Sequence, residues 1–85
     1  MSVTIEPTNV IWDFKGFDDG YTFKEDNNWR RLSLMNSSAC EYAYQNNIEE
    51  ISTHEGEYHF DLINMVMYIN TSEFISPYVR IRRSL

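Results

Sequence analysis

The 85-residue chain has little of what marks a secreted, membrane-spanning or phosphate-loop protein. Its only cysteine is Cys40, so no disulfide can form within it, and its first residues lack the basic and apolar regions of a secretion signal. We therefore expect an intracellular protein, cytoplasmic or nuclear. No apolar run approaches the roughly 20 residues that cross a bilayer, so no membrane role is expected. Its three separated glycines form no glycine-rich phosphate loop.

Positive charge is scarce and unevenly placed. Seven Lys and Arg residues against 13 Asp and Glu give a formal net charge of −6. This balance argues against affinity for DNA, which depends on neutralising phosphates with basic side chains. No Lys or Arg occurs from Glu41 to Glu73, whereas Arg80, Arg82 and Arg83 lie close together near the last residue. A local anion site is therefore compatible with an acidic chain.

Aromatic residues, in contrast, are plentiful: five Phe, six Tyr and two Trp. Because each ring can bury roughly 150 to 250 Å², they can supply the core of one small domain. We expect a single domain over residues 1–85, with its core at about 10–83, and we expect Trp12 and Trp29 to be core aromatics.

Short alternating patterns predict strands, and polar or glycine-containing runs predict turns. The expected strands cover residues 9–14, 21–23, 29–34, 48–54, 58–61, 66–69 and 78–83. The expected turns cover Gly16 with 18–20, 25–28 and 54–57, and 61–65 is expected to form one helical turn. In the last strand, Val79 and Ile81 alternate with Arg80 and Arg82, as in a strand with one buried face.

One short helix is expected. Ser38-Ala39-Cys40-Glu41 matches a capping box, in which the Ser hydroxyl and the Glu carboxylate each accept a backbone N–H at the start of a helix. The helix would place Ala39, Cys40, Ala43 and Tyr44 on one face and stop at Asn46-Asn47. Helix and strands do not alternate as βαβ units, so the predicted class is α+β: a curved antiparallel sheet of about six short strands, a half-barrel, packed on one short α-helix.

Candidates for catalysis or metal binding are few. Structural zinc sites need closely paired Cys or His ligands, and His54 and His59, on opposite sides of a predicted hairpin turn, are expected to be surface residues. Cys40, near a helix start, could have its pKa lowered by the helix dipole; the alternative is a small buried residue on the inner face of the helix. No nucleophile motif such as G-x-S-x-G is present. We expect no metal, no cofactor and no enzyme.

The order and spacing of Trp12, Trp29 and Glu41, followed by Gly56-Glu57-Tyr58 and a basic ending, resemble the WWE module. Asp61-Leu62 and Met65 add to the likeness, which extends from about residue 10 to residue 83. WWE modules are found beside ubiquitin-ligase and ADP-ribosyltransferase domains and bind the iso-ADP-ribose unit of poly(ADP-ribose). The resemblance implies a non-catalytic binding module connected with ADP-ribosylation or the ubiquitin pathway.

The resemblance also implies a ligand pocket at one edge of the sheet. Tyr58 matches a family tyrosine that donates to phosphate, and Phe14 stands where binding members can have Tyr. Met67 stands where the binding pattern has Gln, and methionine lacks the amide that would contact a purine. Arg80 and Arg82 are the phosphate partners if the last strand faces the pocket; otherwise they form a solubilising edge.

Two other functions remain open. A protein-interaction module that keeps the fold and has lost the ligand is indicated by Met67 and by an acidic chain rich in aromatic side chains. A small stand-alone acidic inhibitor that covers a basic surface of its target is the other. The expected partner is thus an ADP-ribose-containing ligand or a protein.

Overall fold

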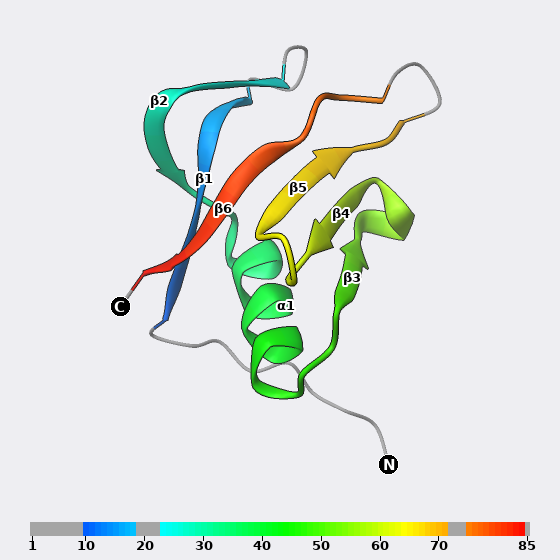
Figure 1. Ribbon diagram of the computed structural model, residues 1–85. Coiled ribbons are helices and arrows are strands. Elements are labelled where there is room, and N and C mark those ends of the chain that lie inside the picture. The colour runs from blue at the N-terminus through cyan, green and yellow to red at the C-terminus, as the bar shows by residue number, and fades with distance from the viewer. Residues whose placement is uncertain (1–9, 19–22, 72–74, 85) are drawn as a thin grey trace.

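The computed structural model describes residues 10–18, 23–71 and 75–84, and within them it contains one curved sheet and one α-helix (Figure 1). The strands are β1 (Ile11–Asp18), β2 (Phe23–Arg31), β3 (Glu50–Thr53), β4 (Tyr58–Asp61), β5 (Val66–Ile69) and β6 (Val79–Ser84). The helix is α1 (Leu34–Gln45), and a short 3₁₀ turn, η1 (His54–Gly56), joins β3 to β4. Neighbouring strands are antiparallel in the order β2-β1-β6-β5-β4-β3, with β2 and β3 at the two edges. The predicted α+β class, an open curved sheet packed on one helix, is confirmed.

The helix α1 lies across the concave face of the sheet and packs against both β1 and β3 (Figure 1). Its Ala39, Cys40 and Ala43 are buried, as the sequence predicts. Burial raises the pKa of the Cys40 thiol far above its ordinary value, which is the opposite of activation by a helix dipole. The alternative interpretation of Cys40, a small buried residue, is therefore correct.

The helix begins five residues earlier than the predicted capping box. Ser33 is the N-cap, and its hydroxyl accepts a hydrogen bond from the backbone N–H of Asn36 at 3.2 Å. Ser38 is buried inside the helix instead, so the prediction of a helix start there is wrong. The cap was missed because the first helical residue, Leu34, is 63% exposed, so the first turn lacks the apolar pattern that normally marks a helix. The predicted end is confirmed, with Asn46 as the C-cap.

The first two strands continue through residues that were expected to form turns. Gly16 and the residues up to Asp18 remain in β1 and pair with the start of β2. The register is irregular here: Lys15 pairs with Trp29, whereas Gly16 pairs with Glu25. The polar residues between these two partners, 26–28, have no partner in β1 and form a bulge. The expected turns at Gly16 and at 25–28 are wrong because a bulge absorbs polar residues without reversing the chain; residues 19–22 lie outside the described part.

Gly16 is needed at this bulge for space. A Cβ atom built there would lie 2.6 Å from the carbonyl oxygen of Lys24 and 3.4 Å from a methyl group of Val79. The oxygen belongs to the backbone of the paired strand, so relief requires β1 and β2 to separate. We expect Gly16→Ala to lower the free energy of unfolding by about 1 to 3 kcal/mol, measured by urea denaturation. Lys15→Ala is the control, and equal stability of Gly16→Ala and the wild type would contradict the steric explanation.

In the second half of the sheet, the strands agree closely with those predicted from the sequence. The hairpin of β3 and β4 forms as predicted, and β5 and β6 lie within one residue of the expected ranges. Along β6, Val79 and Ile81 are buried while Arg80 and Arg82 are exposed, which confirms the predicted alternation. Residues 62–65 form a hydrogen-bonded turn rather than the expected helical turn, because the Asp61 carboxylate accepts the N–H groups of residues 63 and 64.

A buried polar network joins the sheet to the helix. The indole N–H of Trp12, which is fully buried, donates to Glu41 at 2.9 Å. Arg83 donates two hydrogen bonds to the same carboxylate, at 2.8 and 2.9 Å, and Gln45 donates to it at 2.8 Å. Glu41 is therefore a tertiary acceptor and not the predicted capping-box carboxylate. It stabilises the attachment of α1 to β1 and β6.

The two tryptophans have different environments. Trp12 lies in the core, as expected. Trp29 is only partly buried and lies on the outer face of the sheet, where the guanidinium carbon of Arg82 stands 4.2 Å from its ring centroid. The prediction that Trp29 belongs to the core is therefore wrong.

Candidate functional site

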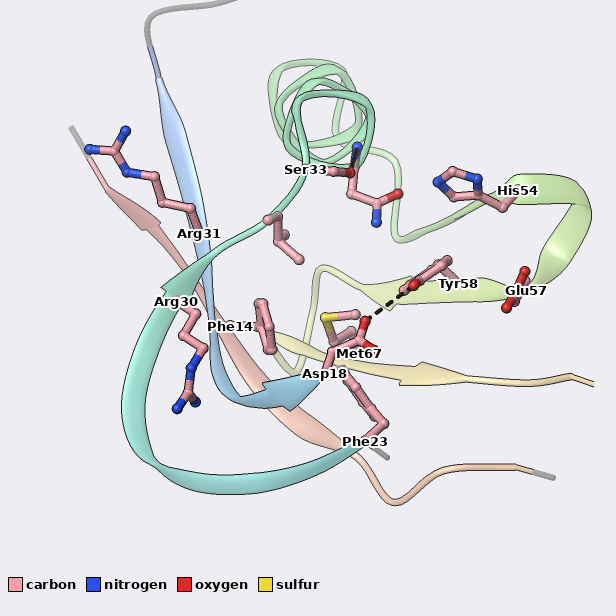
Figure 2. A pocket seen from close by; sticks show the side chains of 12 residues that line it. Phe14, Asp18, Phe23, Arg30, Arg31, Ser33, His54, Glu57, Tyr58 and Met67 are labelled. Carbon is pink, nitrogen blue, oxygen red and sulfur yellow. Dashed lines mark hydrogen bonds between the residues drawn. The ribbon is translucent and has the colours of Figure 1, made fainter. Parts of the chain in front are cut away.

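The concave face of the sheet contains a cleft of about 530 Å³ next to the start of α1 (Figure 2). Side chains from four strands, the 3₁₀ turn and the helix start meet there. The described residues that line it are Phe14, Asp18, Phe23, Arg30, Arg31, Leu32, Ser33, Asn36, His54, Glu57, Tyr58 and Met67. Segments far apart in the sequence thus build one site.

The inner surface of the cleft is apolar. Met67 is 1% exposed and lies between Phe14 and Tyr58 in Figure 2. The ring of Phe14 stacks on that of Phe23, with centroids 6.0 Å apart and planes 25° apart. At the rim, the His54 ring is 5.1 Å from that of Tyr58. The cleft therefore has a hydrophobic floor and aromatic walls.

The hydroxyl of Tyr58 donates a hydrogen bond to the carboxylate of Asp18 at 3.2 Å (Figure 2). Burial and the negative charge of Asp18 raise the pKa of Tyr58 to about 12. The phenol is thus protonated at neutral pH, and its proton is directed at a carboxylate within the protein.

The charges that face the cleft are negative. Asp18 and Glu57 both line it, whereas the guanidinium groups of Arg30 and Arg31 point away from Tyr58 (Figure 2). Arg30 forms an ion pair with Asp26 at 2.9 Å and donates to the carbonyl of Gly16, which holds its charge at the bulge. Arg31 pairs across the sheet with Asp13, whose side chain contacts the outer-face residue Arg82. The described lining therefore combines carboxylates with aromatic rings.

Three of the five residues proposed from the sequence meet in this cleft, and two do not. Phe14, Tyr58 and Met67 line it together. Arg80 and Arg82 lie on the outer face of the sheet, because their neighbours in β6 are the ones that face the core. These two arginines could contact a ligand in the cleft only if their side chains pointed from β6 towards it. They point to the other face of the sheet.

Both outer-face arginines have partners of their own. The Arg82 side chain donates to Asp13 at 3.1 Å, and Arg80 lies 3.8 Å from the carboxylate of Glu25. These contacts fit the alternative interpretation of a charged, solubilising surface.

Sequence reasoning missed Asp18, Phe23 and Glu57. The sequence pattern predicts a turn at Asp18, although Phe14, Gly16 and Asp18 share one face if the strand continues, because side chains in a strand alternate. That spacing is the signal that could have placed Asp18 beside Phe14. No sequence pattern indicates that Glu57, 39 positions later, lies at the same cleft, because its place depends on the β3–β4 hairpin.

Within residues 10–18, 23–71 and 75–84, no three His, Cys, Asp or Glu side chains are grouped to hold a metal ion. His54 lies at the cleft rim, and the ring of His59 stacks on Tyr68 at 4.9 Å. No helix in the described part of the chain has the length and apolar character to cross a membrane.

Comparison with family models, curated proteins and solved structures found no match to this chain. The likeness to WWE modules thus rests on the residues quoted above and stays a prediction.

The Met67 position can be tested directly, because the family pattern has Gln there. The site is almost fully buried, so Met67→Gln would place an amide in an apolar floor. We expect a loss of about 1 to 3 kcal/mol in the free energy of unfolding, measured by urea denaturation. Met35→Gln, at a position that is 59% exposed, is the control. Unchanged stability of Met67→Gln would mean that the floor already accommodates a polar group.

Proposed function

We propose that this chain is a non-catalytic interaction module that receives part of a partner protein in its concave cleft. The observation that carries the proposal is the lining: aromatic and apolar walls from four strands, with two carboxylates among the lining residues. Ligand sites commonly have volumes of roughly 300 to 1,000 Å³, apolar walls and a few placed polar groups. The cleft has all three properties.

The polar groups of the cleft favour a protein over a phosphate-containing ligand. Asp18 and Glu57 would repel phosphate groups, and the arginines of the described lining direct their charge elsewhere. Tyr58 already donates its proton to Asp18. A phosphate would have to replace this bond while standing beside the same carboxylate.

Two further observations support a non-catalytic role. The Ser33 hydroxyl is engaged as the helix cap, and the Cys40 thiol is buried with a raised pKa. A nucleophile needs exposure and either a lowered pKa or an adjacent base. Neither side chain meets these requirements.

Loss of the Tyr58 ring should abolish partner binding through the cleft. Wild-type protein, Tyr58→Ala and Tyr78→Ala would be used to capture partners from cells, followed by direct binding of each purified partner. Tyr78 is 62% exposed and does not line the cleft, so it is the matched control. We expect Tyr58→Ala alone to lose the partner, since aromatic anchors at the centre of a site typically account for 2 kcal/mol or more. Equal binding by both variants would refute the cleft as the interaction site.

A second candidate function, binding of an ADP-ribose-type ligand, is favoured by one observation. Phe14 and Tyr58, two residues that the WWE resemblance proposes, do line one cleft together. Titration calorimetry with iso-ADP-ribose and ADP-ribose at millimolar concentration tests this candidate. Heat that disappears in Tyr58→Phe would support it, because that variant loses only the hydroxyl; absence of heat with both ligands would eliminate it.

A further inference from the structure

Resting on the proposed function, we infer that the cleft receives one positively charged side chain, a lysine or an arginine of the partner. Asp18 is its counter-ion, and the apolar walls contact its aliphatic stem. Three observations support a basic side chain: the charge of the cleft, the hydrogen bond between Tyr58 and Asp18, and the apolar walls.

Charge is the first argument. The two carboxylates of the described lining belong to different elements: Asp18 ends β1, and Glu57 lies between η1 and β4. Both carboxylates attract a cation that enters the cleft. The chain as a whole carries a net charge of −6, so the long-range field also attracts basic partners and increases their rate of association.

The hydrogen bond from Tyr58 prepares Asp18 for this role. It holds the carboxylate at 3.2 Å from the phenol oxygen and keeps it directed into the cleft (Figure 2). Asp18 is also half-buried, and a charge pair is stronger where solvent is partly excluded.

The walls suit the rest of a basic side chain. Lysine and arginine carry several methylene groups that pack on apolar surface while the charged end stays polar. Met67 and Leu32 provide such surface, and the rings of Phe14 and Tyr58 lie on either side of Met67 (Figure 2). A cation near an aromatic face gains further attraction from the ring. An acidic side chain would find the same walls but would be repelled by Asp18.

The test is a titration of the isotope-labelled 85-residue chain with a short lysine-rich peptide, monitored by the chemical shifts of the backbone amides. A glutamate-rich peptide and a neutral peptide of equal length are the ligand controls. We expect the lysine-rich peptide alone to shift cleft residues such as Leu32, Tyr58 and Met67. The variant Asp18→Asn should bind about tenfold more weakly or worse, because it removes the negative charge that pairs with the basic side chain.

Glu50→Gln provides the matched control, because it removes the same charge from an exposed residue of β3 outside the cleft. Equal weakening by Asp18→Asn and Glu50→Gln, or shifts spread over the whole acidic surface, would overturn the inference in favour of unspecific attraction. Should Asp18→Asn fail to fold, Glu57→Gln and Tyr58→Phe replace it: the first removes an exposed carboxylate of the cleft, and the second removes the hydroxyl that holds Asp18. Both are expected to weaken binding several-fold, and unchanged affinity in both would overturn the inference.

The inference and the proposed function can fail separately. If Tyr58→Ala loses the natural partner but the lysine-rich peptide does not shift the cleft residues, the proposed interaction module is supported. The inference that a basic side chain occupies the cleft is then refuted. Retention of the natural partner in Tyr58→Ala would refute the cleft as the interaction site, whatever the peptide does.

Discussion

Glu41→Ala is expected to lower the free energy of unfolding by about 3 to 5 kcal/mol, because it leaves a buried polar network without its acceptor. The side chain of Glu41 is only 10% exposed and accepts hydrogen bonds from the Trp12 indole and from Arg83. In the variant, the indole N–H remains buried without a partner, and Arg83 loses its counter-ion. Domains of this size are marginally stable, so the loss is a large share of the total.

Urea denaturation of three variants would check this result. Glu41→Gln keeps an oxygen that can accept the Trp12 N–H but removes the charge, so its stability should lie between those of Glu41→Ala and the wild type. Glu50→Ala, an exposed position on β3, should change stability by about 0.5 kcal/mol or less. If Glu41→Ala is no less stable than Glu50→Ala, the network does not hold the helix to the sheet.

Acidification should remove the same contribution without a mutation. The hydrogen bonds from Arg83 and, to a smaller extent, from Gln45 and Trp12 lower the pKa of Glu41 to about 2, from an ordinary value of 4.5. Because the folded-state pKa is the lower one, the unfolded chain binds the proton more readily below pH 4.5. The stabilisation is complete above about pH 4.5 and is lost as the pH falls through about 2.

Glu41→Gln separates this residue from the other acids. The pKa values of Asp26 and Asp61 are also lowered, by hydrogen bonds to backbone N–H groups and to neighbouring side chains, so their protonation acts in the same direction. The difference in unfolding free energy between wild type and Glu41→Gln should therefore be constant near neutral pH and shrink from pH 4.5 downwards. A difference that does not depend on pH would show that the Glu41 carboxylate is not selectively stabilised in its ionised form.

Local patterns predicted most of the sheet. The alternation of Val79, Arg80, Ile81 and Arg82 determines which face of β6 is buried, because side chains in a strand alternate. The β3–β4 hairpin likewise follows from two short predicted strands on either side of Gly56, which adopts a positive φ of 91°.

Predictions failed where hydrogen bonds, near or far along the chain, outweigh the pattern of apolar residues. The first turn of α1 exposes Leu34 and Met35, so no apolar stripe indicates a helix there, yet the Ser33 cap starts it. The polar residues 26–28 look like a turn in the sequence but form a bulge, because β2 pairs with β1 on both sides of them. In each case hydrogen bonds determine the local structure, and the spacing of apolar residues in the sequence does not reveal them.

In the cleft, too, the sequence predicted some of the residues but not their surroundings. Phe14, Tyr58 and Met67 were identified from the sequence through a family resemblance, and the fold brings them together. Their chemical setting was not predictable. Asp18 reaches Tyr58 from 40 positions away, and the outward direction of Arg80 and Arg82 removes two expected cations from the cleft.

The sequence by itself determined the α+β class, most strand positions, the core side chains of β6 and the acidic balance of this protein, because these depend on composition and on local alternation. Only the tertiary structure decided the role of Glu41, the outer-face position of Trp29 and the negative charge of the cleft. The physical reason is that ion pairs and hydrogen bonds between distant segments depend on sheet register and on which face each strand presents. A shift of the pairing register by one residue would exchange the inner and outer side chains of a strand.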